Sequence, residues 1–222
     1  PDGAVTTHEF VGMMFQRNPI LALSNNVRYH WAGNETSRVR ITERMGSAKT
    51  LLSSEELIEA LSDPSFNVRH EAISAIAKMP AHPKLVDALI LILGGNEPDL
   101  ALTAAWSLGK LGDKTAIIAL RETLLSKHPL LQARSARALA MLDDQQSKGF
   151  IMDKLHNEQD EGLKVAYASA LGALKTEEAL EPILTLLRTV KDEGTRNEIV
   201  LAVVRIISAE HQYIRLFRNF TK

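Results

Sequence analysis

The sequence predicts an all-α fold: a right-handed α-solenoid of about five helical hairpins with N-terminal capping helices. Three observations support this prediction. Apolar side chains recur at helical spacing, one pattern repeats about every 32 residues, and breaker residues separate the segments. Aromatic residues make up only 5% of the chain, and no stretch alternates apolar and polar side chains as a strand would.

The repeat is clearest in five aligned blocks, each of which is typical of the second helix of a hairpin. The blocks begin 32, 31, 32 and 32 residues apart: VRHEAISAIAKM (68–79), LALTAAWSLGKL (100–111), LQARSARALAML (131–142), LKVAYASALGAL (163–174) and TRNEIVLAVVRI (195–206). One column of the alignment holds small residues: Ala75, Ser107, Ala138, Ala170 and Ala202. The next column holds large apolar residues: Ile76, Leu108, Leu139, Leu171 and Val203. Small side chains let helices approach closely and large ones fill the core, so we expect the members of the second column to be buried between hairpins.

An amphipathic segment precedes each block and is expected to form the first helix of the same hairpin. These segments are 54–61, 84–93, 114–125, 148–155 and 178–190. Turn and breaker residues, such as Asp63–Pro64 and Gly94–Gly95, lie between the segments.

Three regions follow from the extent of the repeat. Residues 1–49 are expected to hold N-terminal capping or linker helices and a half-repeat, 50–208 the repeat array, and 209–222 a C-terminal helix or tail. Asn18–Pro19 is a good helix start, and the helix that follows it is expected to cap one end of the array.

Composition excludes several classes of function. The net charge is −1, so no global field attracts nucleic acid. The chain has no cysteine, which excludes disulfides, thiolate metal sites and cysteine nucleophiles within it. We found no phosphate-binding loop and no serine nucleophile elbow, and we expect no catalytic residue, cofactor or metal.

The pattern DPSFNVRHEAISAI (63–76) resembles the HEAT-like repeats of the bacterial class named after phycobilisome lyases. It has Asp-Pro in the turn, Val-Arg at the opening of the second helix, and then Ala-x-x-Ala-Ile. The resemblance covers about residues 50–208 and implies the architecture. Such repeats serve as scaffolds, enzymes and binding arms alike, so it does not by itself imply a function.

The pair His70–Glu71 is the one candidate for metal ligation. A relative with these repeats, deoxyhypusine hydroxylase, builds a di-iron site from His-Glu pairs on several second helices. Here the other four repeats have Leu102–Thr103, Ala133–Arg134, Val165–Ala166 and Asn197–Glu198 at the matching positions. One pair cannot supply ligands for two irons, so we expect His70 and Glu71 to be solvent-facing residues.

A second resemblance concerns the N-terminal region. The stretch that begins FQRNPILALSNNVRYHWAGNE looks like the junction after the last membrane helix in some bacterial major-facilitator transporters with a HEAT-repeat tail. It implies a cytoplasmic segment whose Arg17, Arg28, Tyr29 and Trp31 lie close to the bilayer. The chain begins with Pro1 rather than Met, and we expect it to be a piece of a longer polypeptide.

These observations lead to an interpretation of function. We expect a non-catalytic, cytoplasmic module for protein interaction or regulation, the soluble domain of a major-facilitator-type transporter at the inner face of the membrane, and not an enzyme. The partner would be another protein or the membrane part of the same polypeptide. The alternative is a stand-alone HEAT-repeat enzyme, similar to a bilin lyase or a hydroxylase.

A binding surface follows from the repeat register. The residues two positions before the large apolar column are Ser74, Trp106, Arg137, Ser169 and Leu201, about 200° around the helix from it. We expect them to line the concave face, with Trp106, Arg137 and Lys110 as the partner-binding residues. The alternative is that Trp106 packs into an adjacent hairpin as core filling.

Overall fold

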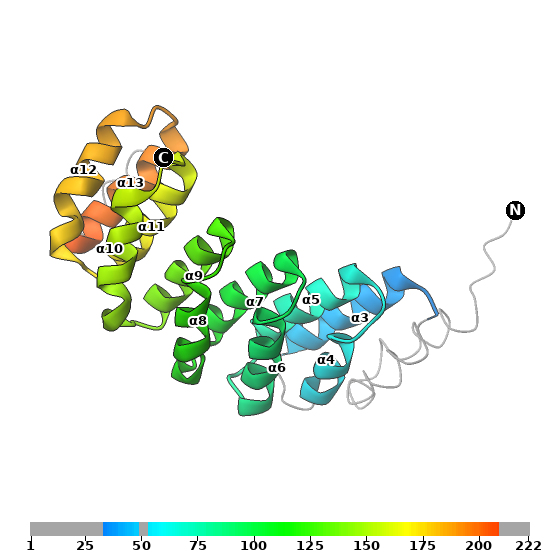
Figure 1. The fold of residues 1–222 in the computed structure, drawn as a ribbon. Coiled ribbons are helices and arrows are strands. Elements are labelled where there is room, and N and C mark those ends of the chain that lie inside the picture. Colours follow the sequence, from blue (N-terminus) through cyan, green and yellow to red (C-terminus); the bar gives the residue numbers. More distant parts are fainter. Residues whose placement is uncertain (1–32, 49–52, 209–222) are drawn as a thin grey trace, which may run out of the picture. The chain divides into compact units, whose positions relative to one another are not determined.

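The computed structural model describes residues 33–48 and 53–208. The chain divides into two compact units, Pro1–Leu111 and Gly112–Lys222. We describe each unit by itself (Figure 1).

The described residues of unit 1, 33–48 and 53–111, form one helix followed by two hairpins, and Figure 1 shows their arrangement. Its helices are α3 (Glu35–Ala48), α4 (Ser54–Ala60), α5 (Phe66–Ile76), α6 (Pro83–Leu93) and α7 (Pro98–Leu111). Helices α4 and α5 form the first hairpin, and α6 and α7 the second. Helices α3, α5 and α7 pack side by side in that order, so the second helices form one layer and the first helices another.

The described residues of unit 2, 112–208, form three hairpins with the same layering. Its α-helices are α8 (Ile117–Thr123), α9 (Pro129–Met141), α10 (Lys148–Asn157), α11 (Glu161–Ala173), α12 (Leu180–Thr189) and α13 (Glu193–Ile206). Short 3₁₀ turns at Lys114–Ala116, Gln145–Ser147 and Glu177–Ala179 precede α8, α10 and α12. Helix α9 packs against α11, and α11 against α13.

The predicted all-α solenoid of about five hairpins is therefore confirmed, with five hairpins in the part of the chain that the structure describes. Helix α3, in the region predicted to hold a half-repeat, packs against α5 as one second helix packs against the next. The capping helix after Asn18–Pro19 and the tail 209–222 lie outside the described residues. The boundaries at 49/50 and 208/209 remain predictions.

Local signals explain where the second helices begin. Ser65, Asp160 and Asp192 are N-caps whose side chains accept hydrogen bonds from Val68, Leu163 and Thr195, at N–O distances of 3.5, 2.9 and 2.7 Å. Helices α7 and α9 instead begin with a proline, whose fixed φ suits the first turn. Each second helix thus starts two residues before its aligned block, because the capping residues lie outside the hydrophobic repeat.

The two repeated columns form the packed interior. Ile76, Leu108, Leu139 and Leu171 are completely buried, as predicted. Only Val203, in the last hairpin, is half-buried. All members of the small-residue column are buried as well.

The small column lets neighbouring second helices approach closely. A Cβ atom added to Gly46 would lie 2.6 Å from the Cα of Ala75, and one added to Gly172 would lie 2.5 Å from the Cα of Ala202. Between α5 and α7, the buried Ser107 hydroxyl donates a 3.0 Å hydrogen bond to the carbonyl oxygen of Ile73. The second helices are therefore in backbone contact, and their relative rotation within a unit is fixed.

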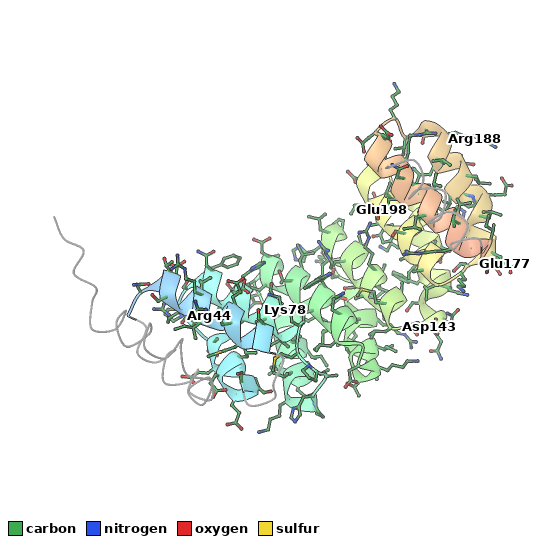
Figure 2. The ribbon with its side chains drawn as sticks, turned by 180° about the vertical axis from the view of Figure 1, so that it is seen from behind. Arg44, Lys78, Asp143, Glu177, Arg188 and Glu198 are labelled. Atoms are coloured by element: carbon green, nitrogen blue, oxygen red, sulfur yellow. The ribbon has the colours of Figure 1, made fainter. Side chains whose placement is uncertain are left out.

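In each unit an ion pair joins an arginine on a helix to an aspartate in a turn. In unit 1, the Arg38 guanidinium donates to both carboxylate oxygens of the buried Asp63, at 2.7 and 3.1 Å. In unit 2, Arg121 makes the same two-point contact with the buried Asp144, with 2.7 Å between Nε and Oδ2. The Arg121 guanidinium holds the pKa of Asp144 below its usual value. Asp143, labelled in Figure 2, precedes it in the left-handed region with a φ of 56° and turns the chain out of α9.

Candidate functional site

The exposed side of the second helices is where the sequence places a binding surface. Each of the five residues in the predicted column, Ser74, Trp106, Arg137, Ser169 and Leu201, is at least partly exposed. The repeat register thus separates a buried side of these helices from an accessible one.

Trp106 is the large aromatic residue of this column. It lies on α7 in unit 1, and 36% of its surface is exposed. Lys110 follows one turn later on the same helix and is exposed. Trp106 is therefore packed over most of its surface, and about a third of it is open to contact with another molecule.

Arg137 lies in unit 2, on α9, so its predicted grouping with Trp106 and Lys110 remains a prediction. Its guanidinium forms an ion pair with Glu198, which is 61 residues away on α13 and is labelled in Figure 2. The pair bridges two helices that both pack on α11. At the matching register positions α11 carries the small residues Ala166 and Ser169, which leave room for the bridge.

Sequence reasoning missed Glu198 as a partner of Arg137. The two residues belong to repeats that are not adjacent, and the pair depends on the small side chains of the helix between them. The repeat register could have indicated this pair. Leu201 and Arg137 belong to the same exposed column, and Glu198 lies three residues, or about one helical turn, before Leu201.

We define the Trp106 face as Ser74 on α5, Lys78 in the turn that follows α5, and Trp106 and Lys110 on α7. Lys78, labelled in Figure 2, lies 32 residues before Lys110 and therefore occupies the same position of the repeat, just beyond the end of α5. The hydrogen bond from Ser107 to Ile73 holds these two helices side by side at this level. Unit 1 thus presents one indole and two ammonium groups on α7 and in the turn after α5.

Glu71 borders this face. Its carboxylate lies 3.9 Å from the ammonium group of Lys78. Burial raises the pKa of Glu71, and Glu43 on α3 adds to this effect while Lys78 opposes it. The positive charge of Lys78 therefore offsets only part of the cost of burying the Glu71 carboxylate.

His70 does not complete a metal site with Glu71. The His70 ring is exposed and stacks on Phe66 of the same helix, with 6.1 Å between ring centroids. Within residues 33–48 and 53–208, no three His, Asp or Glu side chains gather in a way that could hold a metal ion.

The predicted solvent-facing position holds for His70, whereas Glu71 is partly buried. We expect His70→Ala to change the free energy of unfolding by only about 0.5 kcal/mol, as surface substitutions do. We expect an equally small change for Glu71→Ala, because the Glu71 carboxylate is partly desolvated and lies 3.9 Å from the ammonium group of Lys78. Urea denaturation of each variant measures this change. Elemental analysis of wild-type protein purified without added metal is the companion measurement. Stoichiometric iron or zinc that disappears in both variants would contradict the expectation.

Comparison with known proteins identifies the family. A family model described as HEAT repeats matches residues 54–140 and 123–204, and the chain belongs to this family. The curated bilin biosynthesis protein PecE of Mastigocladus laminosus is 30% identical over 135 residues, which are 57% of this chain and 50% of that protein. The chain thus spans about half the length of this relative. The predicted resemblance to repeats of the phycobilisome-lyase type is confirmed.

Two solved structures are similar in fold. A crystal structure of an engineered protein matches with a TM-score of 0.53 at 20% identity, over 85% of this chain and 97% of that one. The complex of CpcE and CpcF of phycocyanin lyase from Nostoc sp. PCC7120 matches with a TM-score of 0.47 at 19% identity, over 85% of this chain and 94% of that one. At this identity the engineered protein supports the architecture alone.

These findings correct the functional prediction. The prediction that the chain is not an enzyme is wrong, because its curated relative is a protein of bilin biosynthesis. This relative is named for bilin biosynthesis and not for transport. In the described part of the chain, every helix is too short or too polar to cross a bilayer.

Proposed function

We propose that the chain acts in bilin chemistry as a HEAT-repeat protein of the lyase type. In this role it binds a linear tetrapyrrole and presents it to an acceptor protein. The observation that carries the proposal is the 30% identity to bilin biosynthesis protein PecE over 135 residues. The earlier alternative of a bilin-lyase-like repeat enzyme thus replaces the transporter interpretation.

The composition of the chain defines how a bilin would be held. Covalent attachment through sulfur needs a cysteine, and these 222 residues contain none. The pigment would therefore bind by stacking, apolar contact and ion pairs, and would leave to a thiol of the acceptor. In this proposal, the protein partner expected from the sequence is the acceptor of the pigment. The proposal also includes a cytoplasmic location.

Binding of biliverdin, a readily available bilin, tests the proposal. A conjugated pigment that enters a protein site changes its visible absorption, so titration of the purified protein should give a saturable spectral change with a Kd on the order of micromolar. Bovine lactalbumin at equal concentration controls for unspecific adsorption of the pigment. The absence of a saturable change up to roughly 100 µM pigment, which corresponds to binding weaker than about 5 kcal/mol, would overturn the proposal.

A further inference from the structure

The Trp106 face has the chemical groups that a bilin requires. A bilin is a flat conjugated chain of four pyrrole rings that carries two propionate groups. A flat π-system gains about 0.5–1.5 kcal/mol from stacking on an aromatic side chain beyond the burial of its area. Carboxylates form charge-assisted hydrogen bonds with ammonium groups.

Trp106 provides the aromatic surface, and its surroundings leave it accessible. The equivalent residue on the neighbouring helix α5 is Ser74, whose side chain is small and partly exposed. The hydrogen bond between Ser107 and the backbone of Ile73 keeps α7 against α5 directly beside this point. The Trp106 indole on α7 is therefore partly exposed, and the equivalent residue on the packed neighbour α5 is the small Ser74.

Lys78 and Lys110 provide the charges. They occupy equivalent positions of the repeat, four residues after Ser74 and Trp106, and both are exposed. Lys110 lies in the last turn of α7 and Lys78 in the turn that follows α5, and these two helices pack against each other. Glu71 contacts Lys78 only at 3.9 Å, which leaves the ammonium hydrogens of Lys78 available to an anion.

We infer that the Trp106 face of unit 1 is the bilin-binding surface, with the pyrrole rings on Trp106 and the two propionates on Lys78 and Lys110. This inference rests on the proposed function and assigns its substrate to named residues. The face combines one exposed aromatic ring with two exposed cations, one in the last turn of α7 and one just after α5, which matches the one π-system and two carboxylates of the ligand.

The test follows the quenching of tryptophan fluorescence by biliverdin. The chain has two tryptophans, Trp31 and Trp106, so Trp31→Phe makes Trp106 the single reporter. In this variant we expect saturable quenching at the pigment concentration that also saturates the absorption change. In the full chain with Trp31 intact, Trp106→Ala and the double change Lys78→Glu with Lys110→Glu should each weaken biliverdin binding by about tenfold or more.

Matched controls keep the test specific. Phe66→Ala removes another exposed aromatic side chain of unit 1, and Lys84→Glu reverses the charge of a lysine on α6; both should bind biliverdin as the wild type does. Trp106→Phe retains a ring and should keep most of the affinity. Biliverdin dimethyl ester, which lacks both carboxylates, should bind the wild type as weakly as biliverdin binds the double lysine variant. Far-UV circular dichroism establishes that each variant is folded.

The outcomes separate the two proposals. If the wild type binds biliverdin and the Trp106 and lysine variants bind it equally well, the assignment to this face is wrong while the proposed function stands. Equal binding of the dimethyl ester would overturn the role of the lysines. If the wild type does not bind biliverdin at all, the proposed function and this inference both fail.

Discussion

Leu139→Ala is expected to lower the free energy of unfolding by about 2–5 kcal/mol, the range for a large-to-small change in a packed core. The Leu139 side chain has 0% of its surface exposed. It lies on α9, which packs against both α8 and α11, so the loss would leave a cavity that neither neighbour can readily fill. Urea denaturation followed by far-UV circular dichroism gives the free-energy difference.

The same helix offers a control with identical chemistry. Leu130 is 65% exposed, so Leu130→Ala removes the same atoms from a largely solvated site. We expect it to change the stability by no more than about 0.5 kcal/mol. Equal losses for the two substitutions would contradict the register that places Leu139 in the core and Leu130 on the surface.

The core was predictable because a repeat of about 32 residues makes each column visible five times. A single Leu139 in isolation fits many structures, whereas Ile76, Leu108, Leu139 and Leu171 at constant spacing require one buried stripe. The same register predicted that Trp106 is accessible, since it lies two residues before this stripe and on the other side of the helix.

Details that depend on three-dimensional contact were not predictable. The Arg137–Glu198 pair spans two repeats, and its formation depends on how much space α11 leaves. The bidentate contact of Arg121 with Asp144 joins a first helix to a turn, and the column comparison of second helices does not include it. An alignment of repeats predicts contacts between residues at equivalent positions of neighbouring repeats. It does not predict contacts between residues at different positions of the repeat.

The prediction that the chain is not an enzyme was wrong for a related reason. Catalysis by phosphate-binding loops or serine elbows leaves a short local motif. A binding surface needs only residues that are separated in sequence and have no fixed pattern, as Lys78, Trp106 and Lys110 are. The lack of a motif was therefore weak evidence against an enzyme, and the relationship to a bilin biosynthesis protein outweighs it.

Backbone contact between second helices gives the remaining large effect, at Gly172. We expect Gly172→Ala to lower the free energy of unfolding by about 1–3 kcal/mol, the usual cost of overpacking a core. The added methyl group would lie 2.5 Å from the Cα, 2.6 Å from the Cβ and 2.9 Å from the carbonyl oxygen of Ala202. All three are backbone or Cβ atoms that cannot rotate away, so α11 and α13 would have to separate.

Gly149→Ala is the matched control for this prediction. Gly149 lies in the first turn of α10, and a Cβ atom added there meets nothing within 4 Å. Alanine favours the helix over glycine, so this change should stabilise the protein by up to about 1 kcal/mol. Opposite signs for the two Gly→Ala changes, measured by urea denaturation, are thus the expected result. A stabilising Gly172→Ala would show that α11 and α13 do not touch through their backbones, and the close packing of second helices would have to be abandoned as what fixes the repeat geometry in unit 2.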